Sequence, residues 1–372
     1  MNRMIRAGIA VLNVIYTFIK LFPTQNKIVM LSRQSNIPSL EFRMLRDEIL
    51  KQDEKIKVVL LSKMLGESIR SKAAYCLHLF IQMYHIATAE VVILDSYCIA
   101  VSILKHKKSL KVIQMWHSIG TMKKFGYSAL DTEEGSGHEL AYTMKMHRNY
   151  DYIFASSDAY KEDLAKGFNY GTEKIITMPL PRVDLLKSSD YSKKTRERIY
   201  SKYPMLKDKP VILYCPTFRK DERDFGRALN ELAEALQGKE YNFVIKLHPL
   251  SKIVPPKGSF VAEEFSSFDM LFVADYLISD YSCIVYEAAV KKIPLFFYNF
   301  DMQIYEKNRG LAIDYYHELP GVISKDPEQI IRAIESRQYD MEKLQKFADK
   351  YVAPVNNATN EIVKFIFKIK GR

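Results

Sequence analysis

The sequence predicts an α/β protein made of two Rossmann-like domains that face a cleft, with an amphipathic helix in front of them. A chain of 372 residues is longer than those that usually fold around a single hydrophobic core. Apolar, strand-like runs alternate with helical patterns along nearly the whole chain, which is typical of parallel sheets covered by helices. The alternation loosens between 181 and 210. We therefore expect an N-terminal domain over 25–185 and a C-terminal domain over 205–350, flanked by amphipathic helices at 1–24 and 351–372.

The first of these helices is apolar except for a narrow polar stripe. The stripe consists of Arg3, Arg6, Asn13, Thr17 and Lys20. A spanning helix needs about 20 apolar residues, and no small-residue cleavage site follows, so we expect a helix in the membrane interface. A helix packed on the protein's own surface is the alternative. The segment 359–372 has a similar cationic, amphipathic character. With a net charge of +11, these two ends predict a peripheral protein on the cytoplasmic side of the cell membrane.

Ten apolar runs are the predicted strands. Six lie in the first half of the chain, at 27–33, 57–63, 90–97, 111–117, 151–157 and 174–180, and four in the second half, at 211–218, 243–249, 276–280 and 294–300. Amphipathic stretches such as 41–51 and 158–168 separate them, and a helical tail starts at about 327. Short strands that alternate with helices predict a parallel sheet in each half.

Polar side chains stand where several of these strands end, which is where open α/β sheets bind their ligands. These residues are His117, Thr217, His248 and Asp280. Lys246 is expected on the same strand face as His248, because strand side chains repeat every two residues. Such a cationic pair suits a diphosphate, although a structural histidine is the alternative. Thr217 and Arg219 would likewise offer a hydroxyl and a bidentate contact to a phosphate.

The run 276–301 predicts a strand, a Ser/Asp/Ser turn, a helix and a second strand. Ser279 or Asp280 would cap the helix, while Ser282 and the first-turn amides face a phosphate. An ordinary capped helix explains this segment equally well. Glu287, further into the helix, is a candidate for binding a ribose hydroxyl pair, or else a solvated helix residue.

His117 follows a tryptophan and precedes a basic, glycine-containing loop. A histidine has an unperturbed pKa of about 6.5 and can take a proton from an attacking hydroxyl. Lys123 and Lys124 in the loop are candidates for holding an anionic acceptor or a lipid diphosphate, or are a solvated charge pair. His138 and His147 lie in a helical pattern and are expected at the surface.

Several familiar signatures are absent from the sequence. There is no Walker-type phosphate loop, and 135–140 lacks the third glycine of a dinucleotide fingerprint. No D-x-D pair and no Cys/His cluster suggests a metal, so we expect neither a metal nor a cofactor. The basic residues are dispersed and form no compact nucleic-acid module. We therefore expect no nucleic-acid partner.

Taken together, these residues resemble the CDP-glycerol glycerophosphotransferase family, which includes the teichoic acid primases and polymerases of Gram-positive bacteria. The resemblance covers roughly residues 90–325. It rests on Trp-His-x-x-Gly-x-x-Lys-Lys at 116–124, Pro-Arg-x-Asp at 181–184, Pro-Thr-Phe-Arg at 216–219, Leu-His-Pro at 247–249, Ser-Asp-Tyr-Ser at 279–282 and the segment 298–321. It implies a glycosyltransferase-B-like fold, metal-independent transfer and attachment to the inner face of the membrane.

The resemblance also implies roles for single residues. His117 would be the base that acts on the acceptor hydroxyl, and His248 would support the donor diphosphate or the leaving phosphate. Arg182 would bind substrate. The residues implied to line the donor phosphates are Thr217, Arg219, Ser279, Asp280 and Ser282. This chain departs from the family pattern at 118–120, at Cys283 and at Glu287, which leaves the alcohol of the donor open.

We therefore expect a membrane-associated transferase. It would move a polyol phosphate, foremost glycerol phosphate from CDP-glycerol, to a hydroxyl of an undecaprenyl-diphosphate-linked saccharide, and release CMP during synthesis of teichoic acid or a related polymer. CDP-ribitol as donor, a polymerising enzyme for teichoic acid or capsule, and a nucleotide-sugar glycosyltransferase remain alternatives. So does a basic membrane-binding or nucleic-acid-binding protein without enzymatic activity.

Overall fold

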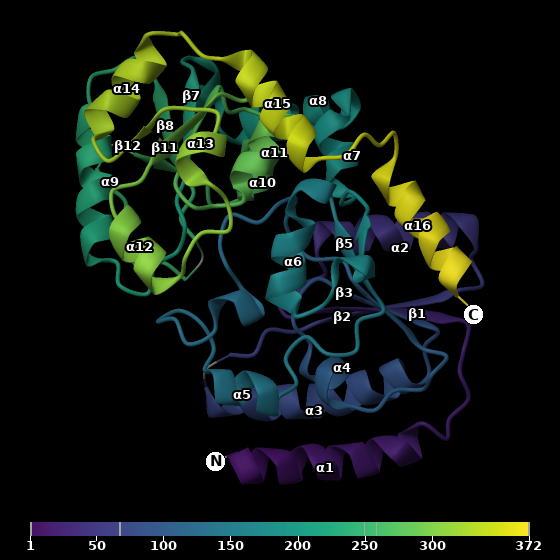
Figure 1. Cartoon of the computed structure of the whole chain (residues 1–372). Helices are drawn as coiled ribbons and strands as arrows, with labels where there is room; N and C mark the ends of the chain where they lie inside the picture. Colours follow the sequence, from purple (N-terminus) through teal and green to yellow (C-terminus); the bar gives the residue numbers. More distant parts are fainter. Residues whose placement is uncertain (1, 67, 249, 258, 371–372) are drawn as a thin grey trace. The chain divides into compact units, whose positions relative to one another are not determined.

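The computed structural model describes residues 2–66, 68–248, 250–257 and 259–370. The chain forms two compact units. Unit 1 contains the residues up to His117, then Lys124–Arg182, and those from Val355 on; unit 2 contains Ser118–Lys123 and Val183–Pro354. Among the described residues, each unit holds one six-stranded sheet in which all strands run parallel (Figure 1). The α/β class predicted from the sequence is therefore confirmed.

Unit 1 is built on a sheet with the strand order β2-β1-β3-β4-β5-β6. Its strands are β1 (Lys27–Ser32), β2 (Lys57–Ser62), β3 (Val91–Leu94), β4 (Lys111–Gln114), β5 (Tyr152–Ala155) and β6 (Ile175–Thr177). Its helices are α1 (Asn2–Ile19), α2 (Leu40–Gln52), α3 (Ile69–Ala87), α4 (Ile99–Ile103), α5 (His138–Thr143), α6 (Lys161–Phe168) and α16 (Ala358–Ile369). Strands β1 and β3 are buried along their whole length, as is usual for parallel strands covered on both faces.

Helices α2 and α16 cover one face of this sheet. Ser39 caps α2 by accepting a hydrogen bond from the backbone N–H of Phe42. The apolar residues of α16 lie in the core that the sheet and α2 share; they are Ile362, Val363, Ile366 and Ile369. The expectation that this C-terminal segment seeks a membrane is therefore wrong, because its apolar face is already buried inside unit 1.

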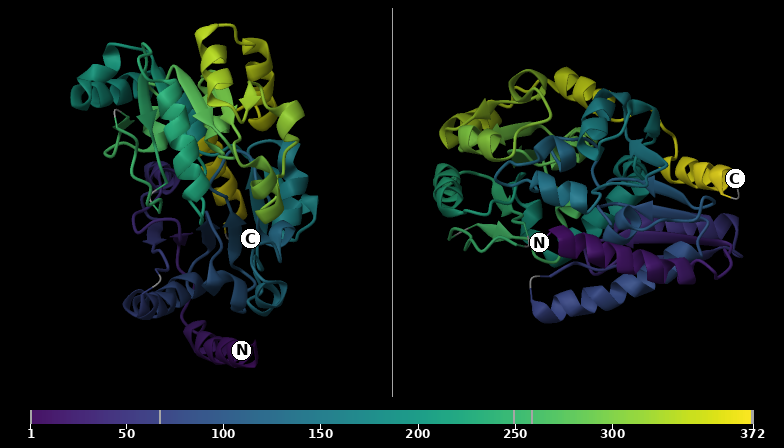
Figure 2. Two further views of the ribbon diagram at one scale, coloured as in Figure 1. Left: turned by 90° about the vertical axis from the view of Figure 1, so that its left-hand side faces the viewer. Right: turned by 60° about the horizontal axis from the view of Figure 1, so that its bottom comes forward.

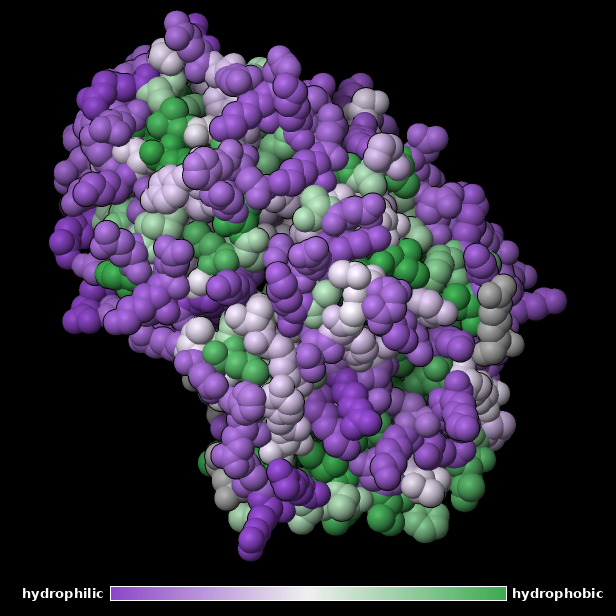
Figure 3. All heavy atoms as spheres, viewed as in Figure 1, coloured by the Kyte–Doolittle hydropathy of each residue, from purple (hydrophilic) through white to green (hydrophobic). Residues whose placement is uncertain are grey.

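Helix α1 packs beside α3 (Figures 1 and 2). Asn13 donates to the carbonyl of Ile103 at 3.0 Å and accepts from the backbone N–H of Lys105 at 2.9 Å. Tyr16 is buried, with its hydroxyl 2.9 Å from Nδ1 of His106. Asn13 of the predicted polar stripe thus faces the rest of unit 1. The opposite, apolar side of α1 is exposed along the lower edge of the view in Figure 3.

Unit 2 has the strand order β12-β11-β10-β7-β8-β9. Its strands are β7 (Val211–Cys215), β8 (Asn242–Ile245), β9 (Phe260–Val261), β10 (Tyr276–Ser279), β11 (Leu295–Tyr298) and β12 (Ile323–Ser324). Its helices are α8 (Ser189–Lys202), α9 (Arg223–Ala235), α10 (Ser267–Met270), α11 (Ile284–Val290), α12 (Met302–Asn308), α13 (Tyr315–Glu318), α14 (Pro327–Glu335) and α15 (Met341–Tyr351), and α7 (Arg182–Lys187) begins at the boundary with unit 1. Apolar residues of α9 and α14 form a core with β7, β8, β10 and β11.

The segment Ser118–Lys123 leaves unit 1 and forms part of unit 2. Lys123 forms an isolated antiparallel bridge with Leu311, and the N–H of Ala312 donates to the carbonyl of Met122 at 3.0 Å. A Cβ atom on Gly120 would lie 2.6 Å from the ring of Tyr286, so only glycine fits this close approach. The sequence predicted a boundary at 181–210. It did not predict that Ser118–Lys123 belongs to unit 2 or that α16 belongs to unit 1.

Candidate active site

The candidate acid–base group of unit 1 lies beyond the carboxyl end of β4. His117 is exposed, and its Nδ1 lies 2.9 Å from the carbonyl oxygen of Asp95, which follows β3. Because a carbonyl oxygen only accepts hydrogen bonds, Nδ1 carries the proton of the neutral ring. Nε2 is then the nitrogen that can take up a proton.

Trp116 fixes the backbone immediately before this histidine. Its φ of 66° lies in the left-handed region, which is unusual for a bulky residue and typical of functional sites. Gln114 holds this conformation by accepting the Trp116 N–H at 2.9 Å. The indole lies 4.2 Å from the His117 ring and 4.4 Å from that of Phe125, measured between centroids.

Arg182, predicted to bind substrate, forms an ion pair with Glu41 of α2. Glu41 is 4% exposed. Burial alone raises the pKa of a carboxyl group, but the charge and hydrogen bond of Arg182 outweigh it and hold the pKa of Glu41 below its ordinary value. His117 is also close enough to contribute to this lowering. No motif in the sequence indicated a role for Glu41.

The two lysines of the basic loop belong to different units. Lys124 is exposed in unit 1, whereas Lys123 is partly buried in unit 2. Burial lowers the pKa of Lys123, and the nearby charge of Arg309 acts in the same direction. Cys283 lies close enough to oppose this shift. Lys123 thus lies close to Cys283, the residue at the N-cap of α11.

His248 lies three residues beyond β8 and is exposed. Its Nδ1 accepts the N–H of Leu250 at 3.2 Å, so Nε2 carries the proton and is a donor. Partial burial and the charge of Lys123 lower the pKa of His248. Pro249 of the predicted motif lies outside the described residues.

Lys246 is not placed as expected. It also lies beyond β8, and its ammonium donates to the carbonyl of Ala262. The two-residue repeat of a strand no longer applies there, because β8 ends at Ile245. The predicted pairing of Lys246 with His248 on one strand face is therefore wrong.

Arg219 and Asp280 form a buried network in unit 2. Nη1 of Arg219 lies 2.6 Å from Asp280, while Nε and Nη2 bind both oxygens of Asp301 at 2.8 and 2.9 Å. Aromatic rings surround the guanidinium; they belong to Phe225, Tyr281, Phe300 and Tyr305. These contacts occupy the guanidinium edge that was expected to hold a phosphate, so in this structure Arg219 positions its neighbours.

The turn before α11 differs in detail from its prediction. Asp280 accepts the backbone N–H groups of Thr217 and Tyr281 at 2.8 and 2.5 Å, and the Ser279 hydroxyl donates to the carbonyl of Cys215 at 2.7 Å. Neither caps the helix, because α11 starts only at Ile284 with Cys283 at its N-cap. The capping expectation is therefore wrong.

Three more predicted residues lie near this turn or on α11. The Ser282 hydroxyl accepts the N–H of Ile284 at 3.5 Å. Glu287 is 2% exposed, which rules out the solvated alternative. The hydroxyl of Thr217 is buried and makes no hydrogen bond with any described residue. Buried hydroxyls are normally paired, so Thr217 is suited to contact a ligand.

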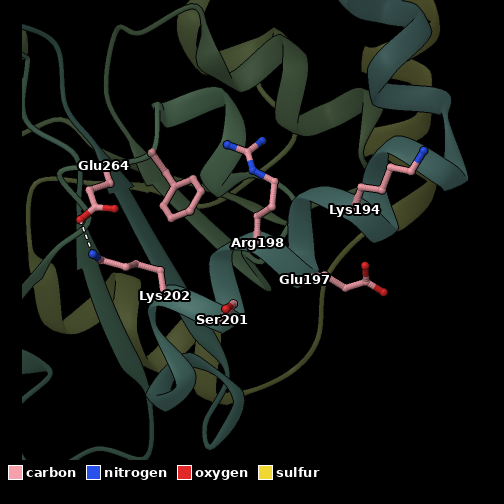
Figure 4. A pocket seen from close by; sticks show the side chains of 7 residues that line it. Lys194, Glu197, Arg198, Ser201, Lys202 and Glu264 are labelled. Carbon is pink, nitrogen blue, oxygen red and sulfur yellow. Dashed lines mark ion pairs between the residues drawn. The ribbon is translucent and has the colours of Figure 1, made fainter.

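Two hollows of unit 2 lie outside this set of predicted residues. One, of about 490 Å³, adjoins Asp301 and the carboxyl ends of β11 and β12. The other, of about 650 Å³, is lined mainly by α8 and contains the ion pair of Lys202 with Glu264 at 2.6 Å (Figure 4). None of the predicted site residues lines either hollow.

His147, expected at the surface, is buried. Its ring packs against those of Tyr97 and Phe168, and its Nδ1 lies 3.0 Å from the hydroxyl of Tyr150. Burial lowers its pKa to about 3, so this histidine is a neutral core residue. His138 is exposed, as predicted.

The two parallel sheets, with polar groups beyond the carboxyl ends of their strands, have a glycosyltransferase-B-like fold. The family model described as CDP-Glycerol:Poly(glycerophosphate) glycerophosphotransferase matches residues 14–368. The chain belongs to this family, and the resemblance found in the sequence is confirmed.

Particular relatives bear this out. The teichoic acid ribitol-phosphate primase of Bacillus spizizenii is 31% identical over 92% of this chain and 91% of its own length. The teichoic acid glycerol-phosphate primase of Bacillus subtilis is 27% identical over 81% of each chain. The solved structure of the wall teichoic acid polymerase TagF has the same fold, with a TM-score of 0.74, 21% identity and coverage of 99% of this chain and 97% of that one.

Proposed function

We propose that the protein transfers a polyol phosphate from a CDP-polyol to a hydroxyl of a lipid-linked saccharide and releases CMP, in the synthesis of teichoic acid or a related polymer. The family match over residues 14–368 carries this proposal. The arrangement of His117 supports it, because the Asp95 carbonyl leaves Nε2 as the basic nitrogen. CDP-glycerol is the proposed donor.

In the proposed reaction, Nε2 of His117 takes the proton of the acceptor hydroxyl. That oxygen forms a bond to the phosphorus that carries the polyol, and the bond from this phosphorus to the CMP oxygen breaks. CMP leaves with the electron pair. Lys123, His248 and Thr217 of unit 2 would bind the donor phosphates, where fixed donors and cations stabilise the developing charge. No metal or cofactor has a role in this proposal.

The donor alcohol has a second candidate. The relative that aligns with 92% of this chain at 31% identity is a ribitol-phosphate primase, so CDP-ribitol is the alternative to CDP-glycerol. Release of CMP from each donor, with UDP-sugars as controls, tests the proposal. Turnover of one CDP-polyol alone identifies the substrate. Turnover of a UDP-sugar with no CDP-polyol reaction would contradict the function.

The number of units added needs a separate experiment. Mass analysis of the product made on a lipid-linked disaccharide distinguishes the two modes. One added unit supports a primase, and a ladder supports a polymerase.

We also propose that the protein binds the cytoplasmic face of the cell membrane through an α1–α3 apolar surface. This surface comprises Met4, Val11, Val14, Phe18, Leu21, Phe22, Ile69, Leu77, Phe80 and Ile81, all exposed. Neither α1 nor α3 contains an acidic residue, while both carry arginine, so anionic lipid headgroups are complementary to it. Within the described residues, no helix is long and apolar enough to cross a membrane.

A further inference from the structure

Helix α8 is strongly basic and borders two hollows of unit 2. Its residues include five lysines and arginines but only two carboxylates. The hollow of about 650 Å³ drawn in Figure 4 lies on one face of the helix, and a second hollow, of about 600 Å³, lies on the adjacent face. Glu197 lines both. We call the second one the α8–α11 hollow, because Lys291 at the end of α11 also lines it.

Two cations of the hollow in Figure 4 already have carboxylate partners. Lys194 lies 2.8 Å from Asp190, and Lys202 lies 2.6 Å from Glu264 (Figure 4). Because these charges are already paired, an anionic ligand would gain little from them.

The α8–α11 hollow has the opposite balance of charge. Its lining includes four cations, Lys187, Lys193, Arg196 and Lys291, and one carboxylate, Glu197. Among the described residues, Lys193, Arg196 and Lys291 form no ion pair with a carboxylate. An anion that enters this hollow therefore meets positive charges that no carboxylate partner neutralises.

Helix periodicity and one hydrogen bond bring two of these cations together. Ser192 and Arg196 are four residues apart on α8 and so lie on the same face of the helix. Nζ of Lys291 donates to the Ser192 hydroxyl at 3.1 Å and lies 4.7 Å from the centroid of the Phe272 ring. The ammonium is thus held beside the face that carries Arg196. Burial lowers the pKa of Lys291, and an anion bound beside it would offset that effect.

The chemistry of the hollow favours a water-soluble phosphodiester chain over a membrane. A helix that lies in a membrane interface needs an apolar face, but α8, all of whose residues are described, exposes no large apolar side chain. A volume of about 600 Å³ is in the range of whole ligand pockets and exceeds what a single phosphate fills. Leu186 and Tyr200 also line it and offer contacts to the carbon atoms of a polyol.

We propose that the α8–α11 hollow binds a segment of a poly(polyol phosphate) chain, with Arg196 and Lys291 contacting a phosphodiester group. An arginine and a lysine on one phosphate combine a planar fork of donors with a point charge. This inference rests on the proposed function for the identity of the ligand, because an enzyme of such a polymer handles the chain as acceptor or product. Lys291 follows α11, whereas the turn at 279–282 precedes it. The hollow is therefore a second site, separate from the proposed donor phosphate contacts.

Binding of a defined chain tests the inference without an enzyme assay. The probes are short, fluorescently labelled oligo(glycerol phosphate) and oligo(ribitol phosphate), followed by fluorescence anisotropy. Arg196→Gln/Lys291→Met should weaken binding of the chain at least about tenfold, because it removes two charge-assisted contacts. The matched control is Lys194→Gln/Lys202→Gln, which removes two paired charges from the other face of α8 and should keep binding within about twofold of wild type.

Two results of this comparison would overturn the inference. Equal losses in both double variants would show attraction by net charge alone, and no loss in Arg196→Gln/Lys291→Met would show that the chain does not bind there. If the substitution of Lys291 prevents folding, Lys193→Gln/Arg196→Gln changes only exposed side chains and should weaken binding in the same direction.

Two further measurements separate this site from lipid binding and from the reaction itself. Arg196→Gln/Lys291→Met should co-sediment with anionic phospholipid vesicles as wild type does; a loss confined to vesicles would assign the hollow to lipid headgroups. Its CMP release on a lipid-linked disaccharide, which carries no polyol phosphate chain, should also be unchanged, and a loss would place the hollow in the reaction. If the wild type releases no CMP from any CDP-polyol, the proposed function fails, while chain binding still decides the role of the hollow.

Discussion

One ring nitrogen of His117 lies against a backbone carbonyl, and we propose the other as the general base. We expect His117→Ala to lose about 10²–10⁴-fold in turnover, the usual contribution of a general base, because the variant removes the imidazole that Trp116 and Asp95 contact. Donor affinity should survive, since the proposed phosphate contacts lie in unit 2. Measurement of CMP release together with calorimetric binding of the CDP-polyol checks both.

The matched control for this variant is His138→Ala, an exposed histidine on α5. It should keep wild-type turnover. If His117→Ala also keeps it, the general-base role is wrong.

Asp95 carries a stability cost that depends on pH. Burial raises the pKa of Asp95 from its ordinary value of 3.8 to about 6, so folding disfavours the ionised carboxylate. The contribution of Asp95 to the free energy of unfolding therefore becomes less favourable as the pH rises from about 4 to about 6. It stays at that unfavourable level at higher pH. Asp95→Asn should therefore stabilise the protein at pH 7.5 by about 3 kcal/mol, because the pKa is raised by about 2.2 and each pKa unit corresponds to 1.36 kcal/mol. At pH 4 we expect little gain.

Denaturant unfolding of wild type and Asp95→Asn at the two pH values measures this difference. Asp131→Asn is the control, since Asp131 lies in a polar, partly exposed turn of the same unit. An equal effect of Asp95→Asn at both pH values would show that ionisation is not the cause.

At the scale of elements, α1 and α3 together present the apolar surface proposed to bind lipid. Phe18 is 67% exposed and Val14 is 59% exposed. The double variant Val14→Asp/Phe18→Asp removes apolar contact area and adds two negative charges. It should lower the fraction bound to anionic phospholipid vesicles at least tenfold, measured by co-sedimentation.

The control is Met341→Asp on α15, which changes a 43% exposed apolar residue in unit 2. It should leave vesicle binding intact. Equal losses in both variants would indicate general adhesion, and no loss in the double variant would refute the lipid surface.

The elements themselves could largely be predicted from the sequence. All ten predicted strands exist, because each is a compact apolar run. The two-residue strands β9 and β12 were missed, since so short a run carries no periodic signal. Strand ends were the weak point: β4 and β8 stop three residues before His117 and His248, so side-chain directions beyond them do not follow the pleat.

The candidate site was predictable where a residue directly follows a strand. Asp95 directly follows β3, as Asp280 follows β10, and could have been found by the same rule. Glu41 could not, because its partner is 141 residues away and only tertiary packing joins them. The pairing of Arg219 with two carboxylates was hidden for the same reason, as was the burial of His147.

At the scale of the whole molecule, the C-terminal helix closes a core that begins near the N-terminus. Ile366 of α16 is fully buried against α2 and the unit 1 sheet. Ile366→Ala should cost about 2–5 kcal/mol, the usual range for such a truncation. Lys368→Ala, exposed on the same helix, should have little effect.

Denaturant unfolding followed by a unit 1 signal, such as the fluorescence of Trp116, measures both variants. This tryptophan lies in unit 1 and is the single one of the chain. A loss confined to unit 2 would contradict the assignment of α16.

The same chain path sets an order of assembly during synthesis. The chain passes between the units at four points, after His117, Lys123, Arg182 and Pro354. The ribosome must finish all of unit 2 before it makes α16, so the first sheet emerges early yet lacks one of its two covering helices on that face. Synthesis of unit 1 therefore starts first and ends last. Until α16 has been made, the apolar residues that it will cover stay exposed and can bind a chaperone.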